Sequence, residues 1–160
     1  MKKRIITHLI IFAVIYLVAA VFRFDRGLIS YVNLSDALIM ILLTHSEPPY
    51  AAIIAGLSTA LADITAGFGY YAPYTFIIKG ISGYLTALGW RKHWKNEAVC
   101  IIVGILNVIG YSLRDYLIFE VHTERLLQSL AVNGIIMAVS VIAAIIANRY
   151  CATIKDRYLR

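Results

Sequence analysis

The apolar residues of this 160-residue chain fall in long runs that short polar breaks separate. A helix needs about 20 mostly apolar residues to cross the hydrocarbon core of a bilayer, and most of these runs approach that length. They are continuous and lack the alternation of apolar and polar residues that a lipid-facing strand requires, so we expect helices. The predicted helices are residues 5–22, 34–43, 49–66, 73–90, 97–119 and 126–150.

The second stretch is too short to cross a membrane by itself. It needs either residues 28–33 to extend it or a buried position that lets it stop early, so the pattern does not fix its limits. The first stretch follows Met1-Lys-Lys-Arg and resembles a signal peptide. No small-residue cleavage site follows it, because Val21-Phe-Arg-Phe is bulky, and we expect a retained helix.

Composition supports a membrane protein. The mean hydropathy is +0.77, and with 61% hydrophobic and 15% charged residues the chain has too little polar surface for a soluble domain. We therefore expect an all-α integral membrane protein, a six-helix bundle in which residues 1–160 form a single transmembrane domain.

Basic residues predict the orientation, because they favour cytoplasmic loops. With both termini cytoplasmic, ten basic residues lie inside and three lie outside. This asymmetry also accounts for the net charge of +6, so the charge gives no argument for a nucleic-acid partner. The inner set is Lys2, Lys3, Arg4, Arg91, Lys92, Lys95, Arg149, Lys155, Arg157 and Arg160, and the outer set is Arg23, Arg26 and Arg125.

Ionisable residues interrupt the apolar stretches near one side of the membrane. Asp63 lies near the outer end of the third helix, Lys79 about 9 Å below the start of the fourth at 1.5 Å per residue, and Arg114 and Asp115 near the outer end of the fifth. Such charges cost at least ~2.5 kcal/mol each on insertion scales and should face protein or water. Further polar residues on these helices and the sixth are Thr59, Thr75, Asn107, Tyr111, Ser129 and Asn133.

Two interpretations of these groups remain open. They form a solute site that opens outward, or Asp63 pairs with Lys79, and Asp115 with Arg114 or a neighbour, only to hold helices together. We expect Asn107, which lies nearer mid-membrane, to make an interhelical hydrogen bond. The outer loop at residues 67–74 carries Tyr70, Tyr71 and Tyr74, which either cover a flat ring or belong to the interfacial aromatic belt.

Small residues recur every four positions on two helices. The third carries Ala51, Ala55 and Thr59 beside Ala52, Gly56 and Ala60, and the sixth carries Gly134 and Ala138, then Ala143 and Ala147. Such ridges allow close helix packing within the chain, or against a partner if exposed.

Motifs for catalysis are missing from the sequence. There is no phosphate-binding G-x-x-x-x-G-K-[ST], no H-E-x-x-H and no G-x-S-x-G. Cys100 and Cys151 lack metal-ligand spacing, so we expect no enzyme, cofactor or metal site. A solute site without an energy source suggests a partner.

Three segments together resemble a known family, the substrate-binding S components of energy-coupling factor (ECF) vitamin transporters, in the riboflavin/hydroxymethylpyrimidine-type branch. They are Tyr31-Val-Asn-Leu-Ser-Asp-Ala-Leu, Ala55-Gly-Leu-Ser-Thr-Ala-Leu-Ala-Asp63-Ile-Thr-Ala-Gly67 and Tyr71-Ala-Pro-Tyr-Thr-Phe-Ile-Ile-Lys79-Gly. The resemblance covers residues 31–90 and extends weakly through Gly110-Tyr111 and Val132-Asn133-Gly134.

The resemblance implies a multi-pass subunit of the bacterial plasma membrane that binds a vitamin or precursor from outside. Its partners would be a transmembrane coupling (T) protein and two cytoplasmic ATPase subunits. The A-x-x-x-A docking motif usual on the family's first helix is absent here, since that helix carries only Ala13, Ala19 and Ala20. The expected substrate-binding residues are Asp63, Tyr71, Tyr74, Thr75, Lys79, Tyr111, Arg114 and Asn133.

Lys79 and Arg114 would suit a polar or anionic substituent, and the tyrosines a heteroaromatic ring. We favour a small pyrimidine or pyridine vitamin, with riboflavin as the larger option. Two other classes fit the helix number, namely a membrane scaffold of the rod-shape-determining type and a small membrane enzyme that uses Asp63, Lys79 and Asp115 as acid/base groups.

Overall fold

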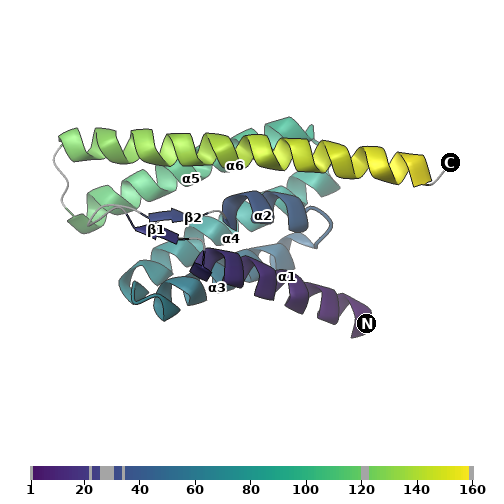
Figure 1. The fold of residues 1–160 in the computed structure, drawn as a ribbon, viewed down its shortest axis with the longest axis horizontal. Coiled ribbons are helices and arrows are strands. Elements are labelled where there is room, and N and C mark those ends of the chain that lie inside the picture. Colours follow the sequence, from purple (N-terminus) through teal and green to yellow (C-terminus); the bar gives the residue numbers. More distant parts are fainter. Residues whose placement is uncertain (1, 22, 26–30, 34, 120–122, 159–160) are drawn as a thin grey trace.

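The structure, a computed structural model, describes residues 2–21, 23–25, 31–33, 35–119 and 123–158. These residues form helices and one short ribbon of two strands (Figure 1). The helices are α1 (Lys2–Val21), α2 (Ser35–Leu42), α3 (Pro48–Thr65), α4 (Ala72–Arg91), α5 (Asn96–Phe119) and α6 (Thr123–Tyr158), with a 3-10 turn, η1 (Gly69–Tyr71). The strands are β1 (Arg23–Asp25) and β2 (Tyr31–Asn33).

The helical segments agree with the hydropathy pattern, and the strands do not. β1 and β2 pair antiparallel with Phe24 opposite Val32, a short ribbon that the expectation of a helical bundle did not include. Residues 28–30, which could have extended the second helix, lie outside the described residues. α2 has only eight residues, and four of them are buried.

Within the described residues, three helices are long and apolar enough to cross a membrane. Their spans are Lys2–Val21, Asn96–Leu117 and Leu126–Cys151. The protein surface agrees with a membrane environment, since large apolar side chains such as Leu9, Ile135 and Ile146 are more than 60% exposed. The chain is therefore a helical membrane protein. The other three helices are not among these spans, because polar residues lower the hydropathy of α3 and α4 and because α2 is short.

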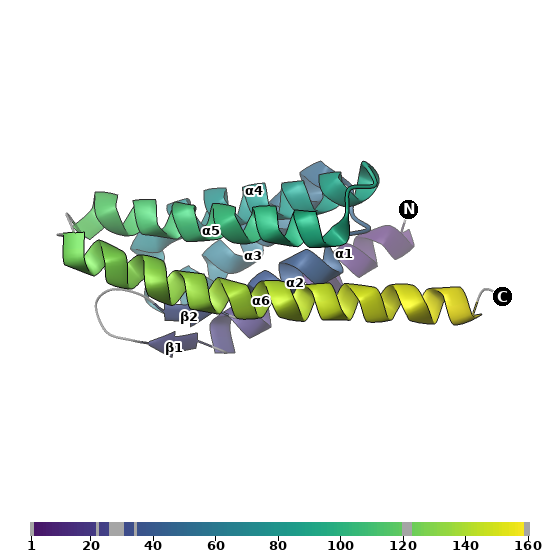
Figure 2. The same ribbon diagram turned by 90° about the horizontal axis from the view of Figure 1, so that it is seen from above.

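The bundle has two distinct ends. Both termini lie at one end, called here the terminal end (Figures 1 and 2). The β1–β2 ribbon, η1 and the junction of α5 with α6 lie at the other, called here the ribbon end. α3 packs most extensively against α4, and α5 against α6.

The short helix α2 joins two apolar clusters. Ile39 belongs to a cluster with Ile15 and Ile54, whereas the next residue, Met40, belongs to a cluster with Val103 and others of α5 and α6. Asn148 of α6 also donates a hydrogen bond of 3.1 Å to the Met40 carbonyl. α2 is thus buried between helices on both sides, which allows it to stop short of a full crossing.

Small residues bring α3 and α4 close together. A Cβ atom added at Gly83 would lie 2.5 Å from the Ala51 carbonyl oxygen, and one at Gly56 would lie 2.7 Å from the Phe76 carbonyl oxygen. The α3 ridge therefore packs within the chain. The first ridge of α6 differs, because an added Cβ at Gly134 would meet no atom within 4 Å, and Gly134 and Ala138 line an open apolar groove between α5 and α6.

Candidate functional site

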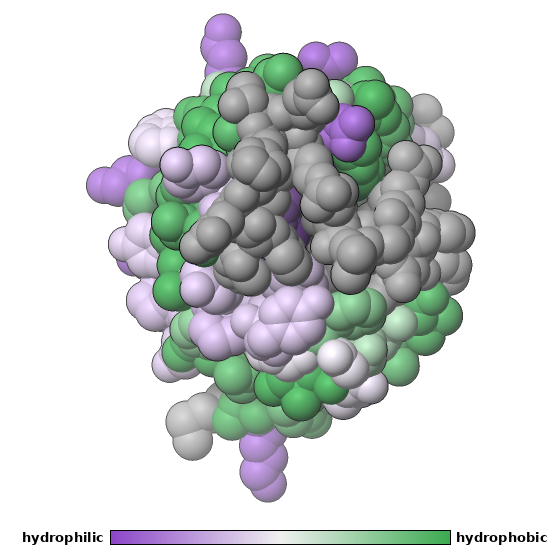
Figure 3. All heavy atoms as spheres, turned by 90° about the vertical axis from the view of Figure 1, so that its left-hand side faces the viewer, coloured by the Kyte–Doolittle hydropathy of each residue, from purple (hydrophilic) through white to green (hydrophobic). Residues whose placement is uncertain are grey.

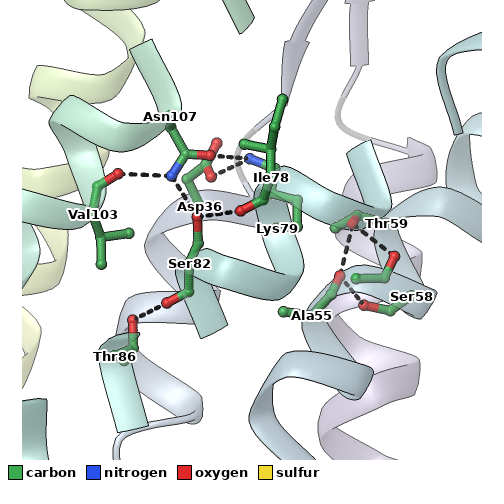
Figure 4. A network of polar contacts seen from close by, with 11 residues as sticks. Asp36, Ala55, Ser58, Thr59, Ile78, Lys79, Ser82, Thr86, Val103 and Asn107 are labelled. Atoms are coloured by element: carbon green, nitrogen blue, oxygen red, sulfur yellow. Dashed lines mark hydrogen bonds and ion pairs between the residues drawn. The ribbon is translucent and has the colours of Figure 1, made fainter. Parts of the chain in front are cut away.

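Lys79 lies at the centre of a buried polar network. It is fully buried on α4 and forms an ion pair with Asp36 of α2, and its ammonium donates a hydrogen bond of 3.3 Å to the Asn107 side-chain oxygen on α5 (Figure 4). A buried ammonium is costly unless it is paired, so the carboxylate accounts for its presence there. Lys79 therefore pairs with Asp36, where the sequence had suggested Asp63.

Asn107 connects α5 to α4. Its side-chain NH₂ donates to the Ser82 hydroxyl and to the Val103 carbonyl, both at 2.8 Å. The Ser82 hydroxyl in turn donates to the Ile78 carbonyl at 2.8 Å (Figure 4). The predicted interhelical hydrogen bond of Asn107 is thus present. The same hydrogen bonds hold the Asn107 side chain so that its amide oxygen faces Lys79.

A second buried cluster joins α5 to α6. The Arg114 guanidinium donates from Nε at 2.9 Å and from Nη2 at 2.5 Å to Oδ1 of Asp115. The other carboxylate oxygen of Asp115 accepts a 2.5 Å hydrogen bond from Ser129, whose hydroxyl accepts one of 3.1 Å from Asn133. The expected pairing of Arg114 with Asp115 is present, and Asn133 reaches it through Ser129.

Aromatic rings connect the two clusters. The Tyr111 ring lies between the two cations, with Lys79 Nζ 4.9 Å and Arg114 Cζ 4.8 Å from its centroid. Arg114 also lies 4.5 Å from the ring centroid of Tyr71, which belongs to η1. Cations attract ring faces in this way and more strongly when water is excluded. Burial raises the pKa of Tyr71 above its ordinary value, so its phenol stays neutral.

The end of α3 positions both Asp63 and the chain that leads to Tyr71. Gly67 has φ 83°, its N–H donates to the Ile64 carbonyl, and the Phe68 N–H donates to the Asp63 carbonyl at 2.8 Å. These two bonds form a Schellman cap, which reverses the chain directly after the helix. The Asp63 side chain is fully buried and interacts electrostatically with Lys79 and Tyr111.

Some of the remaining residues expected to bind substrate are buried, and others are exposed. Thr75 is fully buried and lies beside Tyr111. Tyr74 is 39% exposed and Tyr70 55% exposed, so of the three loop tyrosines only Tyr71 is buried with the network. Figure 3 views the ribbon end, where a pale violet patch of weakly hydrophilic residues lies near the middle of the face, with hydrophobic residues below it.

Asp36 is the residue that sequence reasoning missed. It stands in the first turn of α2, where a carboxylate is common because it interacts favourably with the helix N-terminus. Because a carboxylate is common at this position, Asp36 was not singled out from the sequence. The available signal was its position within a short apolar run beside Ser35, which is also buried.

Comparisons with known proteins agree with this architecture. A family model described as "ECF-type riboflavin transporter, S component" matches residues 2–154, so the chain belongs to this family of multi-pass membrane transporter components. Among curated proteins, the thiamine precursor transporter HmpT of Lactococcus lactis subsp. cremoris (strain MG1363) is 40% identical over 62 residues. That alignment covers 38% of this chain and 37% of the relative. No solved structure matches the chain.

Proposed function

We propose that this chain is the substrate-binding component of an ECF-type vitamin importer. It binds a small heteroaromatic vitamin or precursor and delivers it through a coupling (T) protein that two ATPase subunits drive. The observation that carries the proposal is the buried network at the ribbon end, where Asp36, Lys79, Tyr111, Arg114 and Tyr71 from four elements meet. A network of this kind inside a membrane bundle is expected at a substrate pathway.

The chemistry of the network fits a flat, polar ring. Tyr71 and Tyr111 supply aromatic faces, and Lys79 and Arg114 supply N–H donors for ring nitrogens, carbonyls or hydroxyls. The proposed ligand-contacting residues are Asp63, Tyr71, Tyr74, Thr75, Lys79, Tyr111, Arg114 and Asn133. The family description names riboflavin and the relative's name a thiamine precursor; we favour a pyrimidine or pyridine compound.

The proposed topology has six membrane-embedded helices, cytoplasmic termini and a site that opens outward. It is supported by the position of both termini at one end of the bundle and of η1, which carries Tyr71 of the network, at the other (Figure 1), together with the excess of basic residues in the segments at the terminal end. The chain itself is proposed to carry no enzymatic activity. The family match gives no support to the scaffold or membrane-enzyme alternatives.

Ligand binding by the purified chain tests the proposal. Native mass spectrometry should detect a co-purified heteroaromatic compound, and titration with riboflavin and with hydroxymethylpyrimidine should identify the tighter ligand. The double variant Asp36→Asn/Lys79→Met should bind that ligand at least about tenfold more weakly, as expected for one lost charge-assisted hydrogen bond.

The matched control is the other interhelical ion pair, Arg149–Glu97, which is 2.7 Å long, solvent-exposed and built on the opposite halves of α6 and α5 from the network. Its neutral variant, Arg149→Met/Glu97→Gln, should bind like the wild type. Equal affinity of the Asp36→Asn/Lys79→Met variant and the wild type would place the ligand elsewhere.

A further inference from the structure

Among the side chains that the structure describes, the buried network contains two cations, Lys79 and Arg114. Each of them touches a carboxylate, Lys79 that of Asp36 and Arg114 that of Asp115. A further carboxylate, Asp63, is buried in the same region. The charge of each described cation is therefore offset by a carboxylate that it touches.

This balance opposes an anionic ligand. An anion that enters the network leaves water and finds both cations already neutralised, so it gains too little to offset its desolvation. An uncharged ligand meets no such cost. Lys79 has three N–H donors, and its described hydrogen-bond partners, Asp36 and Asn107, occupy two of them. The third suits an uncharged acceptor such as a ring nitrogen or a carbonyl.

We propose that Asp36 is a specificity-determining residue, which neutralises Lys79 and thereby makes the site select uncharged heteroaromatic compounds over their phosphate esters. This inference rests on the proposed function and adds the charge class of the substrate. It narrows the sequence-based expectation, in which Lys79 and Arg114 suit a polar or anionic substituent, to uncharged polar substituents.

Asp36 is well placed for this role because it comes from outside the helix that carries Lys79. α2 supplies the carboxylate and α4 the ammonium, and the two residues are 43 positions apart in the sequence. Asn107 holds the same ammonium from α5 through an uncharged oxygen. Replacing Asp36 by Asn therefore removes one charge and retains an amide of similar size at the same position.

The experiment measures dissociation constants for two ligand pairs, riboflavin with its 5′-phosphate and hydroxymethylpyrimidine with its phosphate. In each pair the ester should bind the wild type at least about a hundredfold more weakly than its parent. The ratio of the two dissociation constants, ester to parent, should fall by about tenfold or more in Asp36→Asn. In Asp36→Glu this ratio should equal the wild-type value. The same ester-to-parent ratio is compared between the wild type and the Asp36 variants. The phosphate adds the same size in each protein, so a change in the ratio reports the effect of the charge at residue 36.

Glu97→Gln is the control for loss of a carboxylate remote from the network, and its ratio should equal that of the wild type. Equal binding of ester and parent by the wild type would overturn the inference and leave the proposed function standing, as would a folded Asp36→Asn protein with an unchanged ratio. Binding of none of the four compounds would contradict the inference, and the absence of any co-purified heteroaromatic compound as well would contradict the proposed function. If Asp36→Asn does not fold, Asp36→Asn/Lys79→Met, which carries neither charge, should still reject the esters, and acceptance of them would overturn the inference.

Discussion

At the scale of single residues, the fully buried Lys79 touches one carboxylate among the described side chains, that of Asp36, and Asp63 acts on it from further away. Breaking a buried pair leaves an uncompensated charge, which costs more than removing both members. The network of Asn107 and Ser82 supplies uncharged partners only, so it cannot replace Asp36. The stability of this part of the bundle therefore depends on the Asp36–Lys79 pair being intact or wholly absent.

Single and double substitutions at this pair should be strongly non-additive. Asp36→Asn or Lys79→Met alone should lower the free energy of unfolding by about 3–5 kcal/mol, and the double variant should recover most of that loss. Denaturant or thermal unfolding in detergent measures the effect. Variants of the exposed pair Arg149–Glu97 should change the stability far less, because solvent screens that pair. Additive losses at Asp36 and Lys79 would show that the two side chains are not coupled.

Sequence reasoning found Lys79, Arg114 and Asp115 and left open whether Lys79 pairs with Asp63, whereas the ion pair that the structure shows is with Asp36. A charge in the middle of an apolar run is conspicuous, so Lys79 could be identified from hydropathy alone. Its partner depends on which helices are neighbours in space, and helical periodicity does not contain that information. Asp36 and Asp63 were both available carboxylates, and only the position of α2 between the helices distinguishes them.

At the scale of helices, the contact between α3 and α4 depends on glycine. An added Cβ at Gly83 would lie 2.5 Å from a backbone oxygen and 2.8 Å from the Ala55 Cβ. Neither contact is with the end of a flexible side chain, so the two helices would have to move apart. Both helices carry site residues, Asp63 on α3 and Lys79 on α4, and the packing of small residues therefore sets the spacing of the site.

Alanine at two glycines should separate close packing from helix propensity. Gly83→Ala should destabilise the protein by about 1–3 kcal/mol, the usual cost of overpacking, and should also weaken ligand binding. Gly134→Ala, on α6 in open space, should cause no loss of stability. Unfolding in detergent and ligand titration measure both effects. Similar losses for the two variants would contradict the proposed role of Gly83.

The spacing of small residues correctly indicated close helix packing on α3 but not at the first ridge of α6. Ala51, Ala55 and Gly56 do form the α3–α4 contact, because small residues on one face let a second helix approach. Gly134 and Ala138 show the same spacing but line an open groove. Small residues every four positions allow a second helix to approach closely. Whether a helix packs there depends on how the rest of the bundle is arranged.

At the scale of the whole molecule, the helices divide the polar groups between two ends. The connection between α4 and α5, which carries Lys92 and Lys95, lies at the terminal end, whereas η1, which carries Tyr71, and the junction of α5 with α6 lie at the ribbon end (Figures 1 and 2). The positions of the helices followed from hydropathy. The β1–β2 ribbon did not, because strands of three residues are too short to show an alternating pattern.

Cysteine labelling should establish which end faces outward. In a background with Cys100→Ala and Cys151→Ser, Tyr70→Cys should react with an impermeant maleimide added to intact cells, because Tyr70 is 55% exposed at the ribbon end. Lys95→Cys, exposed between α4 and α5, should react only after the cells are permeabilised. The reverse labelling would invert the proposed topology and place the site on the cytoplasmic side.

The two buried ion pairs also differ in when they can form during synthesis. Arg114 and Asp115 are adjacent, so their pair enters the bilayer together with α5, whose span is apolar enough to cross alone. Asp36 and Lys79 are 43 residues apart on helices that are not among the three spans found in the described residues, and an isolated charge at a helix centre costs about 2.5–3.5 kcal/mol on insertion. The carboxylate of α2 leaves the ribosome first and is compensated only once α4 has been made. We therefore expect the segment from α2 to α4 to enter the membrane collectively, while α1, α5 and α6 can each be inserted as a single helix.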